Sequence, residues 1–131
     1  MRQMRLKIPH HNPNNDKLVF DAWFSTGSLV RATQKLKEDG VVSIRGTPYS
    51  TPGVRFAASR YMVDNYAEAK QRLLDEYKKN GYIVEEEFIE RYMIRMAVFV
   101  LVVQERVKFW LVENNLLEKH KNYIASLITI E

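Results

Sequence analysis

The sequence predicts a mainly α protein, in which a helix-turn-helix-like N-terminal domain is followed by long helices that form an oligomerisation region. Three observations support this fold class. Apolar residues recur at helical spacing along most of the chain. Capping residues precede these runs, and Gly follows several of them. The segment from Phe88 to Asn115 contains neither Gly nor Pro. We expect residues 1–15 to form a flexible basic arm, residues 16–80 the helix-turn-helix-like domain and residues 81–131 the oligomerisation region.

Composition excludes several classes of protein. A chain of 131 residues with 46% apolar residues is not a disordered protein. The absence of cysteine excludes disulfides and thiol catalysis, and it is compatible with a reducing cytosol. The first residues include basic side chains but no apolar run of signal-peptide length. We therefore expect a cytoplasmic protein.

Charge is distributed unevenly between the two halves of the chain. Residues 1–63 hold ten Lys and Arg against four Asp and Glu, a balance of +6. Residues 64–131 hold ten against twelve, a balance of −2. Because positive potential attracts phosphate groups, the N-terminal half is the candidate for binding a polyanion.

Two short helices are predicted first. Any of three residues, Asn14, Asn15 or Asp16, can cap a helix that runs to Trp23 or Phe24. Ser28 is the cap of a second helix, which ends near Asp39-Gly40 because Gly tolerates the left-handed conformation that closes a helix. The inner face of this helix carries Leu29, Ala32 and Leu36.

A third helix follows an inserted segment. The insertion, Val41 to Ser50, alternates apolar residues and contains a turn signal, so it is either an extended arm or a short hairpin. The helix starts at Ser50 or Thr51, with Pro52 at its first position. Its predicted inner face comprises Val54, Ala58, Tyr61 and Met62. Its open side carries Arg55, Ser59 and Arg60, which suits a helix that enters the major groove of DNA. The alternative is a three-helix packing unit with solvated arginines.

A fourth helix and then the most apolar segment complete the prediction. The fourth helix begins after Asp64-Asn65 and ends at Lys78-Lys79-Asn80-Gly81. The Glu85-Glu86-Glu87 triplet favours a helix start, and the simplest interpretation of Phe88 to Asn115 is one long helix.

The centre of this long helix, Met96 to Val103, is apolar on every side. It is too short for a membrane span, for which about 18 apolar residues are required. A buried strand is a second interpretation, but the flanking residues keep helical spacing. We favour a helix packed against its own subunit on one side and neighbouring copies on the other. The predicted oligomerisation residues are Tyr92, Met96, Phe99, Val100, Val103, Val107 and Trp110.

The remaining polar residues give no pattern that indicates catalysis. His120 lies on an apolar stripe of the tail, where we expect a partly buried interface residue, and Ile128–Ile130 is a possible short strand. The adjacent pair His10-His11 does not match a metal-binding spacing. Phosphate-cradling glycine loops and nucleophile elbows are absent from the sequence. We therefore expect no catalytic residue, metal or cofactor, and no enzyme.

The layout resembles the small terminase subunits of tailed bacteriophages. The resemblance lies in WFSTGSLVRATQKL and STPGVRFAASRYMV, followed by the apolar helical region and a short tail. In that family, rings of identical subunits recognise viral DNA and regulate the large subunit during genome packaging. The resemblance implies that Arg55, Ser59 and Arg60 contact DNA and that Arg31 and Lys35 contact phosphates. Arg45 on the inserted segment completes the predicted DNA contacts.

The sequence thus predicts a DNA-binding oligomer that acts in genome packaging in the host cell cytoplasm. The expected partners are double-stranded DNA, further copies of the chain in a ring of about eight to twelve, and the large terminase subunit. A dimeric transcriptional regulator is the alternative among DNA-binding proteins. A structural or adaptor protein of a virion that does not bind DNA is the alternative from a different class.

Overall fold

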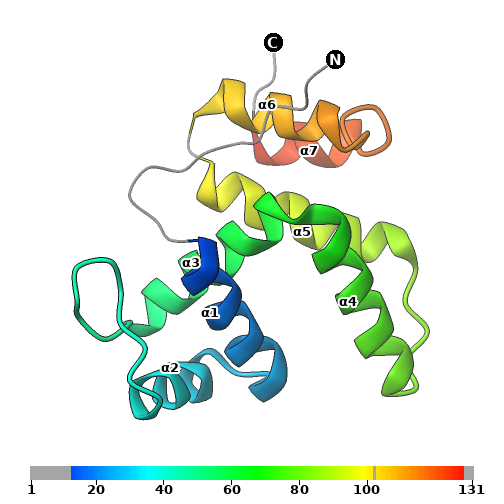
Figure 1. Cartoon of the computed structure of the whole chain (residues 1–131). Coiled ribbons are helices and arrows are strands. Elements are labelled where there is room, and N and C mark those ends of the chain that lie inside the picture. The colour runs from blue at the N-terminus through cyan, green and yellow to red at the C-terminus, as the bar shows by residue number, and fades with distance from the viewer. Residues whose placement is uncertain (1–12, 102, 129–131) are drawn as a thin grey trace. The chain divides into compact units, whose positions relative to one another are not determined.

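The computed structural model describes residues 13–101 and 103–128, which fold into seven helices (Figure 1). The mainly α fold class is confirmed. The helices are α1 (Pro13–Thr26), α2 (Leu29–Glu38), α3 (Thr51–Asp64), α4 (Tyr66–Lys79), α5 (Glu86–Val100), α6 (Gln104–Glu113) and α7 (Lys121–Leu127). Pro13–Asn15 are already helical, so the first helix begins within the segment predicted as an arm. The rest of that arm and the end of the predicted terminal strand lie outside the described residues.

The chain divides into two compact units between Tyr61 and Met62, inside α3. We refer to described residues 13–61 as the N-terminal unit and to those from Met62 onward as the C-terminal unit. The predicted boundary near Gly81 lies inside the C-terminal unit. The physical reason is that α4, which precedes Gly81, packs against α5, which follows it.

Local capping chemistry explains why the helices of the N-terminal unit begin where they do. The Ser28 hydroxyl accepts a hydrogen bond of 3.2 Å from the Arg31 amide at the start of α2. The Ser50 hydroxyl accepts one of 3.1 Å from the Gly53 amide at the start of α3. Both caps were predicted from the sequence. Helix α2 packs against α1 through its buried inner face, which includes Ala32 and Leu36.

The segment between α2 and α3 is a small closed loop with hairpin character. A single antiparallel bridge joins Val42 to Pro48, and the Ser43 amide donates a 2.8 Å hydrogen bond to the Thr47 carbonyl. The Asn15 side-chain amide in α1 donates to the Val42 carbonyl at 3.0 Å. The loop is therefore closed on itself and tied to α1.

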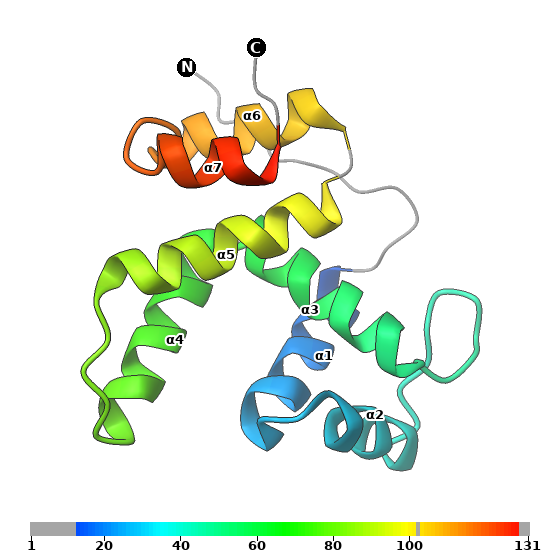
Figure 2. The ribbon, with the colours of Figure 1, turned by 180° about the vertical axis from the view of Figure 1, so that it is seen from behind.

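The C-terminal unit is built around α5. Helices α4 and α5 form a hairpin, and α6 and α7 both lie against α5 (Figure 2). The indole nitrogen of Trp110 in α6 donates a buried 2.9 Å hydrogen bond to the carbonyl of Val63, at the end of α3. The same indole meets the Tyr66 ring edge-on, with centroids 5.4 Å apart. Trp110 therefore packs inside its own chain.

The single long helix predicted from Phe88 to Asn115 is wrong. Helix α5 ends at Val100 and α6 begins at Gln104, because Leu101 and Val103 leave the helical conformation. Valine loses side-chain rotamers in a helix, so its helix propensity is lower than that of leucine. A valine-rich stretch therefore favours a helix end here, although each valine disfavours the helix much less than a proline would. Because the chain changes direction between Val100 and Gln104, α6 can pack against α5. One straight helix cannot pack against itself in this way.

This fold also corrects the predicted oligomerisation surface. Four of the seven residues, Met96, Val100, Val107 and Trp110, are core residues of the C-terminal unit. Tyr92 is half-buried. The side chains that stay accessible are those of Phe99, 43% exposed, and Val103, 48% exposed.

Candidate nucleic-acid interface

Two of the six residues predicted to contact DNA form interactions within the protein instead. Ser59 is 1% exposed, and its hydroxyl donates a 2.8 Å hydrogen bond to the Arg55 carbonyl within α3. The Arg60 guanidinium forms a 3.0 Å ion pair with Asp16, a residue that is only 2% exposed. It also lies over the Phe56 ring, 5.1 Å from the centroid. Ser59 is therefore buried, and the Arg60 guanidinium is held by Asp16 and by the Phe56 ring, so neither side chain projects from an open side of α3 as predicted.

The two predicted DNA contacts on α2, Arg31 and Lys35, are exposed, but they lie on the side of α2 opposite Thr33. Helix α2 meets α3 through a 3.2 Å hydrogen bond between the hydroxyls of Thr33 and Thr51. Successive helical residues advance by about 100°, so Arg31 and Lys35 lie roughly 160° and 200° around the helix from Thr33. Lys37 lies only about 40° from Thr33 by the same geometry. Lys35 is also paired with Asp39 at 3.5 Å.

By this geometry Lys37 is the cation of α2 on the side of Thr33, and it is not among the predicted DNA contacts. Lys37 follows Thr33 by four residues, and Arg55 follows Thr51 by four residues. Each therefore lies about one turn, some 5.4 Å along its helix, from the contact between the two hydroxyls. Both side chains are exposed. The spacing of four residues between Thr33 and Lys37 is visible in the sequence. The hydrogen bond between Thr33 and Thr51, which shows that this face of α2 is near α3, is not.

Arg45 belongs to the loop between these helices and lines a hollow in the N-terminal unit. The hollow has a volume of about 320 Å³. Its wall comprises the tip of the loop, Asn15 of α1 and a stripe of α3 formed by Gly53, Phe56 and Arg60. We call it the loop hollow. Arg55 lies on a different face of α3 and is not part of this lining.

The loop hollow is lined by both aromatic and polar groups. Tyr49 is half-buried, and burial raises the pKa of its hydroxyl above the ordinary value despite a hydrogen bond with Asn15. The hydroxyls of Ser43 and Thr47 lie 3.1 Å apart across the hairpin. The hollow therefore combines a flat apolar surface with hydroxyl groups and a guanidinium.

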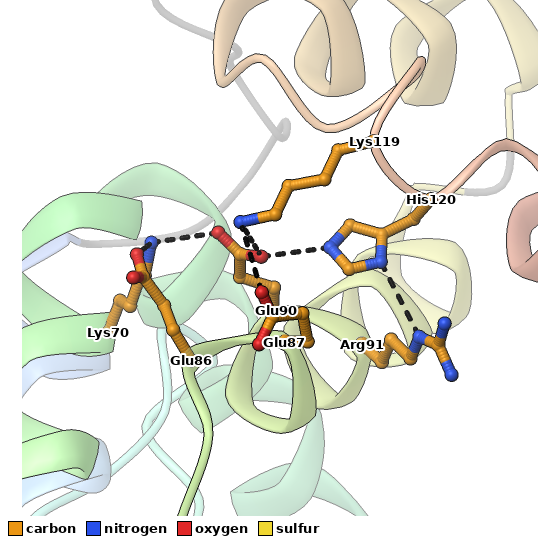
Figure 3. A network of polar contacts seen from close by, with 7 residues as sticks. All are labelled: Lys70, Glu86, Glu87, Glu90, Arg91, Lys119 and His120. Atoms are coloured by element: carbon orange, nitrogen blue, oxygen red, sulfur yellow. Dashed lines mark hydrogen bonds and ion pairs between the residues drawn. The ribbon is translucent and has the colours of Figure 1, made fainter.

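A second polar cluster lies in the C-terminal unit, where six residues surround Glu90 (Figure 3). Glu90 is 4% exposed and accepts hydrogen bonds from Lys119 at 2.7 Å and from Lys70 at 2.9 Å. The His120 ring nitrogen Nε2 lies 2.9 Å from the same carboxylate. Arg91 donates to the other ring nitrogen at 3.4 Å. Since that nitrogen accepts, His120 carries its proton on Nε2 and donates it to Glu90.

The electrostatics of this cluster are those of a structural network. Burial raises the pKa of Glu90, but the hydrogen bonds from Lys119, Lys70 and His120 outweigh it and lower the pKa to about 2. Burial lowers the pKa of Lys70, yet its bonds to Glu86 and Glu90 raise it above its ordinary value. His120 is 3% exposed. A histidine so enclosed cannot reach a substrate, and the expected interface residue is instead part of the core.

Comparison of the chain with known protein families, curated proteins and solved structures gives no match. Within residues 13–101 and 103–128, His, Asp and Glu side chains form no group of three that could hold a metal ion. The helices of these same residues lack the apolar length that a bilayer-spanning helix requires.

Proposed function

We propose that this protein binds double-stranded DNA through the cations around the contact between α2 and α3. The supporting observation is the position of Lys37 and Arg55, each one turn from the hydrogen bond between Thr33 and Thr51. Arg45 extends this cationic surface onto the loop. The N-terminal unit has seven Lys and Arg against four Asp and Glu, a balance of +3. Such a surface attracts the phosphate backbone.

The mode of contact differs from a recognition helix that inserts its whole length into a groove. Of the residues of α3 that belong to the N-terminal unit, only Pro52 and Arg55 are exposed. One exposed arginine cannot read several bases, so backbone contacts dominate and sequence discrimination is weak. Each unit therefore binds DNA weakly on its own. Several copies in one assembly multiply that affinity if they engage one duplex together.

The multivalent mechanism fits the packaging role suggested by the resemblance to small terminase subunits. In this proposal, a ring of copies in the host cell cytoplasm holds viral DNA and regulates a large terminase subunit. The chain is then a binding protein with no catalytic group of its own. Assembly uses the exposed apolar residues around α6, which are Val103, Phe109 and Val112, because four of the seven residues first expected to form the assembly surface are core.

A salt-dependent binding measurement tests the DNA proposal. Three phosphate contacts give a slope of log K against log salt of about −3. Changing both Lys37 and Arg55 to Ala removes two of these contacts, so the slope falls in magnitude by about 2 and affinity falls about tenfold or more. Fluorescence anisotropy with a labelled duplex at several salt concentrations measures both quantities.

The matched control changes Arg31 and Lys35 to Ala. It removes the same charge from the opposite side of α2, so the expected loss of affinity is much smaller. Equal losses for the two double variants would indicate non-specific attraction to net charge. Binding that does not change in either variant would exclude this interface.

A second candidate function is an interaction module that does not bind DNA. The enclosed positions of Ser59 and Arg60 favour it, because they remove two of the three contacts expected on α3. In that case the wild-type protein shows no saturable binding to the duplex at low salt, which the same anisotropy titration detects.

A further inference from the structure

The loop hollow has a lining that matches a nucleotide better than it matches a duplex backbone. We propose that it binds one nucleoside monophosphate group, with the phosphate at Arg45 and the base against Tyr49 and Phe56. The group is either a free nucleotide or the terminal nucleotide of a nucleic-acid strand. This site shares Arg45 with the proposed duplex surface, but Lys37 and Arg55 do not line it.

The charge of the lining selects an anion. Arg45 and Arg60 both line the hollow, and its lining contains no carboxylate. Arg60 is balanced by Asp16 behind it, at 3.0 Å. Arg45 is exposed and lines the hollow from the loop. One uncompensated guanidinium can donate two hydrogen bonds to a phosphate in fork geometry.

Hydroxyl donors extend the same anion site. The Ser50 oxygen accepts from the Gly53 amide at 3.1 Å, which leaves the Ser50 hydrogen available for a ligand oxygen. Ser43 and Thr47 share one hydrogen bond between their hydroxyls, so one hydroxyl hydrogen of this pair is also available to a ligand. A phosphate has three terminal oxygens that accept hydrogen bonds from such donors.

The aromatic residues account for the base. Tyr49 and Phe56 are both half-buried and come from the loop and from α3. The Arg60 guanidinium, 5.1 Å from the centre of the Phe56 ring, holds that ring in place. Aromatic side chains beside a cationic groove are the usual means of holding an unstacked base. The volume of about 320 Å³ falls within the range of small-molecule pockets.

Gly53 keeps the hollow open. A Cβ atom at this position would lie 3.1 Å from the Ser50 hydroxyl oxygen and 3.7 Å from the Tyr49 ring. Gly is less favourable than Ala within a helix, so helix stability does not account for a Gly here. The Ser50 cap approaches this position closely, and the missing side chain also leaves the hollow open. The variant Gly53→Ala should therefore keep the fold and crowd the hollow.

The experiment is an NMR titration of the full chain with dAMP, deoxyadenosine and deoxyribose 5-phosphate. We expect dAMP to cause saturable shifts in residues 43–56, and each half molecule to bind about tenfold more weakly. Gly53→Ala and Arg45→Ala should each weaken dAMP binding about tenfold, whereas the control Arg31→Ala should not. A thermal melt confirms that Gly53→Ala remains folded, and Arg45 is an exposed loop residue whose loss does not threaten the fold.

A short single strand with and without a 5′ phosphate distinguishes the two sources of the ligand. Tighter binding of the phosphorylated strand than of dAMP identifies a strand end, and the reverse identifies a free nucleotide. Absence of saturable shifts up to about 10 mM for dAMP and for the phosphorylated strand overturns the proposal, as does unchanged binding by folded Gly53→Ala. Duplex binding by Gly53→Ala should equal that of the wild type. The nucleotide site and the duplex surface can therefore fail independently.

Discussion

Glu90 is the residue whose environment differs most from that of an ordinary surface carboxylate. It is 4% exposed and contacts Lys70, Lys119 and His120, which come from α4 and from the turn before α7. Breaking a buried ion pair from one side leaves the remaining charges without a counter-charge. The network therefore ties α4, α5 and the segment before α7 together, and its stability depends on one carboxylate.

We predict that Glu90→Gln lowers the free energy of unfolding by about 3 kcal/mol at neutral pH, because a pKa lowered from 4.5 to about 2 corresponds to that amount. Since the folded-state pKa is the lower one, this contribution is complete above pH 4.5 and is lost as the pH falls towards 2. Urea unfolding of both proteins across this window measures it. A stability difference that stays constant down to pH 2 would contradict the assignment.

Glu87→Gln is the matched control for this experiment. Glu87 is one turn from Glu90, but its side chain is 52% exposed and 3.9 Å from Lys119. Exposed ion pairs of this kind contribute about 0–1 kcal/mol. Its unfolding curve should therefore lie close to that of the wild type.

Single residues also show where sequence patterns stop being informative. Helical spacing placed Arg55, Ser59 and Arg60 on the open side of α3, and only Arg55 is exposed. Ser59 shares a helical face with Arg55 by its spacing, but a serine can satisfy its hydroxyl within its own helix and be buried. Arg60 is enclosed because Asp16, 44 residues earlier in the chain, pairs with it. A long-range pair of this kind leaves no periodic signal.

At the scale of elements, most start and stop signals were predicted correctly, but the cap of α1 and the long apolar run were not. Helix α1 begins at Pro13, so the expected caps Asn14, Asn15 and Asp16 lie inside it. The caps at Ser28 and Ser50 and the stop at Asn80-Gly81 each rest on one local hydrogen bond or one backbone angle, which neighbouring residues determine. The break between α5 and α6 has no Gly or Pro to mark it. It depends on the burial of both helices, which is a tertiary effect that overrides local propensity.

The break predicts different outcomes for two valines three residues apart. Val100 is 5% exposed at the end of α5, so Val100→Asp places an unpaired carboxylate in the core and costs several kcal/mol. Val103 is 48% exposed, so Val103→Asp should change stability by no more than about 1 kcal/mol. Thermal unfolding followed by circular dichroism should show a Tm lowered by about 10 °C or more only for Val100→Asp. An equal loss of stability in the two variants would instead favour one continuous helix in which both valines are buried.

At the scale of the whole molecule, the two units carry different surfaces. The N-terminal unit has a positive balance, whereas the C-terminal unit presents exposed apolar side chains on α6. Phe109 is 38% exposed and Val112 is 53% exposed, and their spacing of three residues puts them on one face. This face is the one through which we propose that copies contact each other, because most of the apolar residues of α5 are buried within the chain.

We predict that changing Phe109 and Val112 together to Asp lowers the molar mass measured by light scattering, while the melting temperature changes little because both positions are exposed. Gln104→Asp is the control, since it adds a carboxylate at the exposed start of the same helix, where negative charge is tolerated. A wild-type mass of about eight to twelve copies favours the packaging ring, and a mass of two favours a dimeric regulator. A wild type that is a monomer at high concentration, or a double variant that keeps the wild-type mass, would show that α6 is not the assembly surface. The avidity that the proposed DNA binding requires would then need another origin.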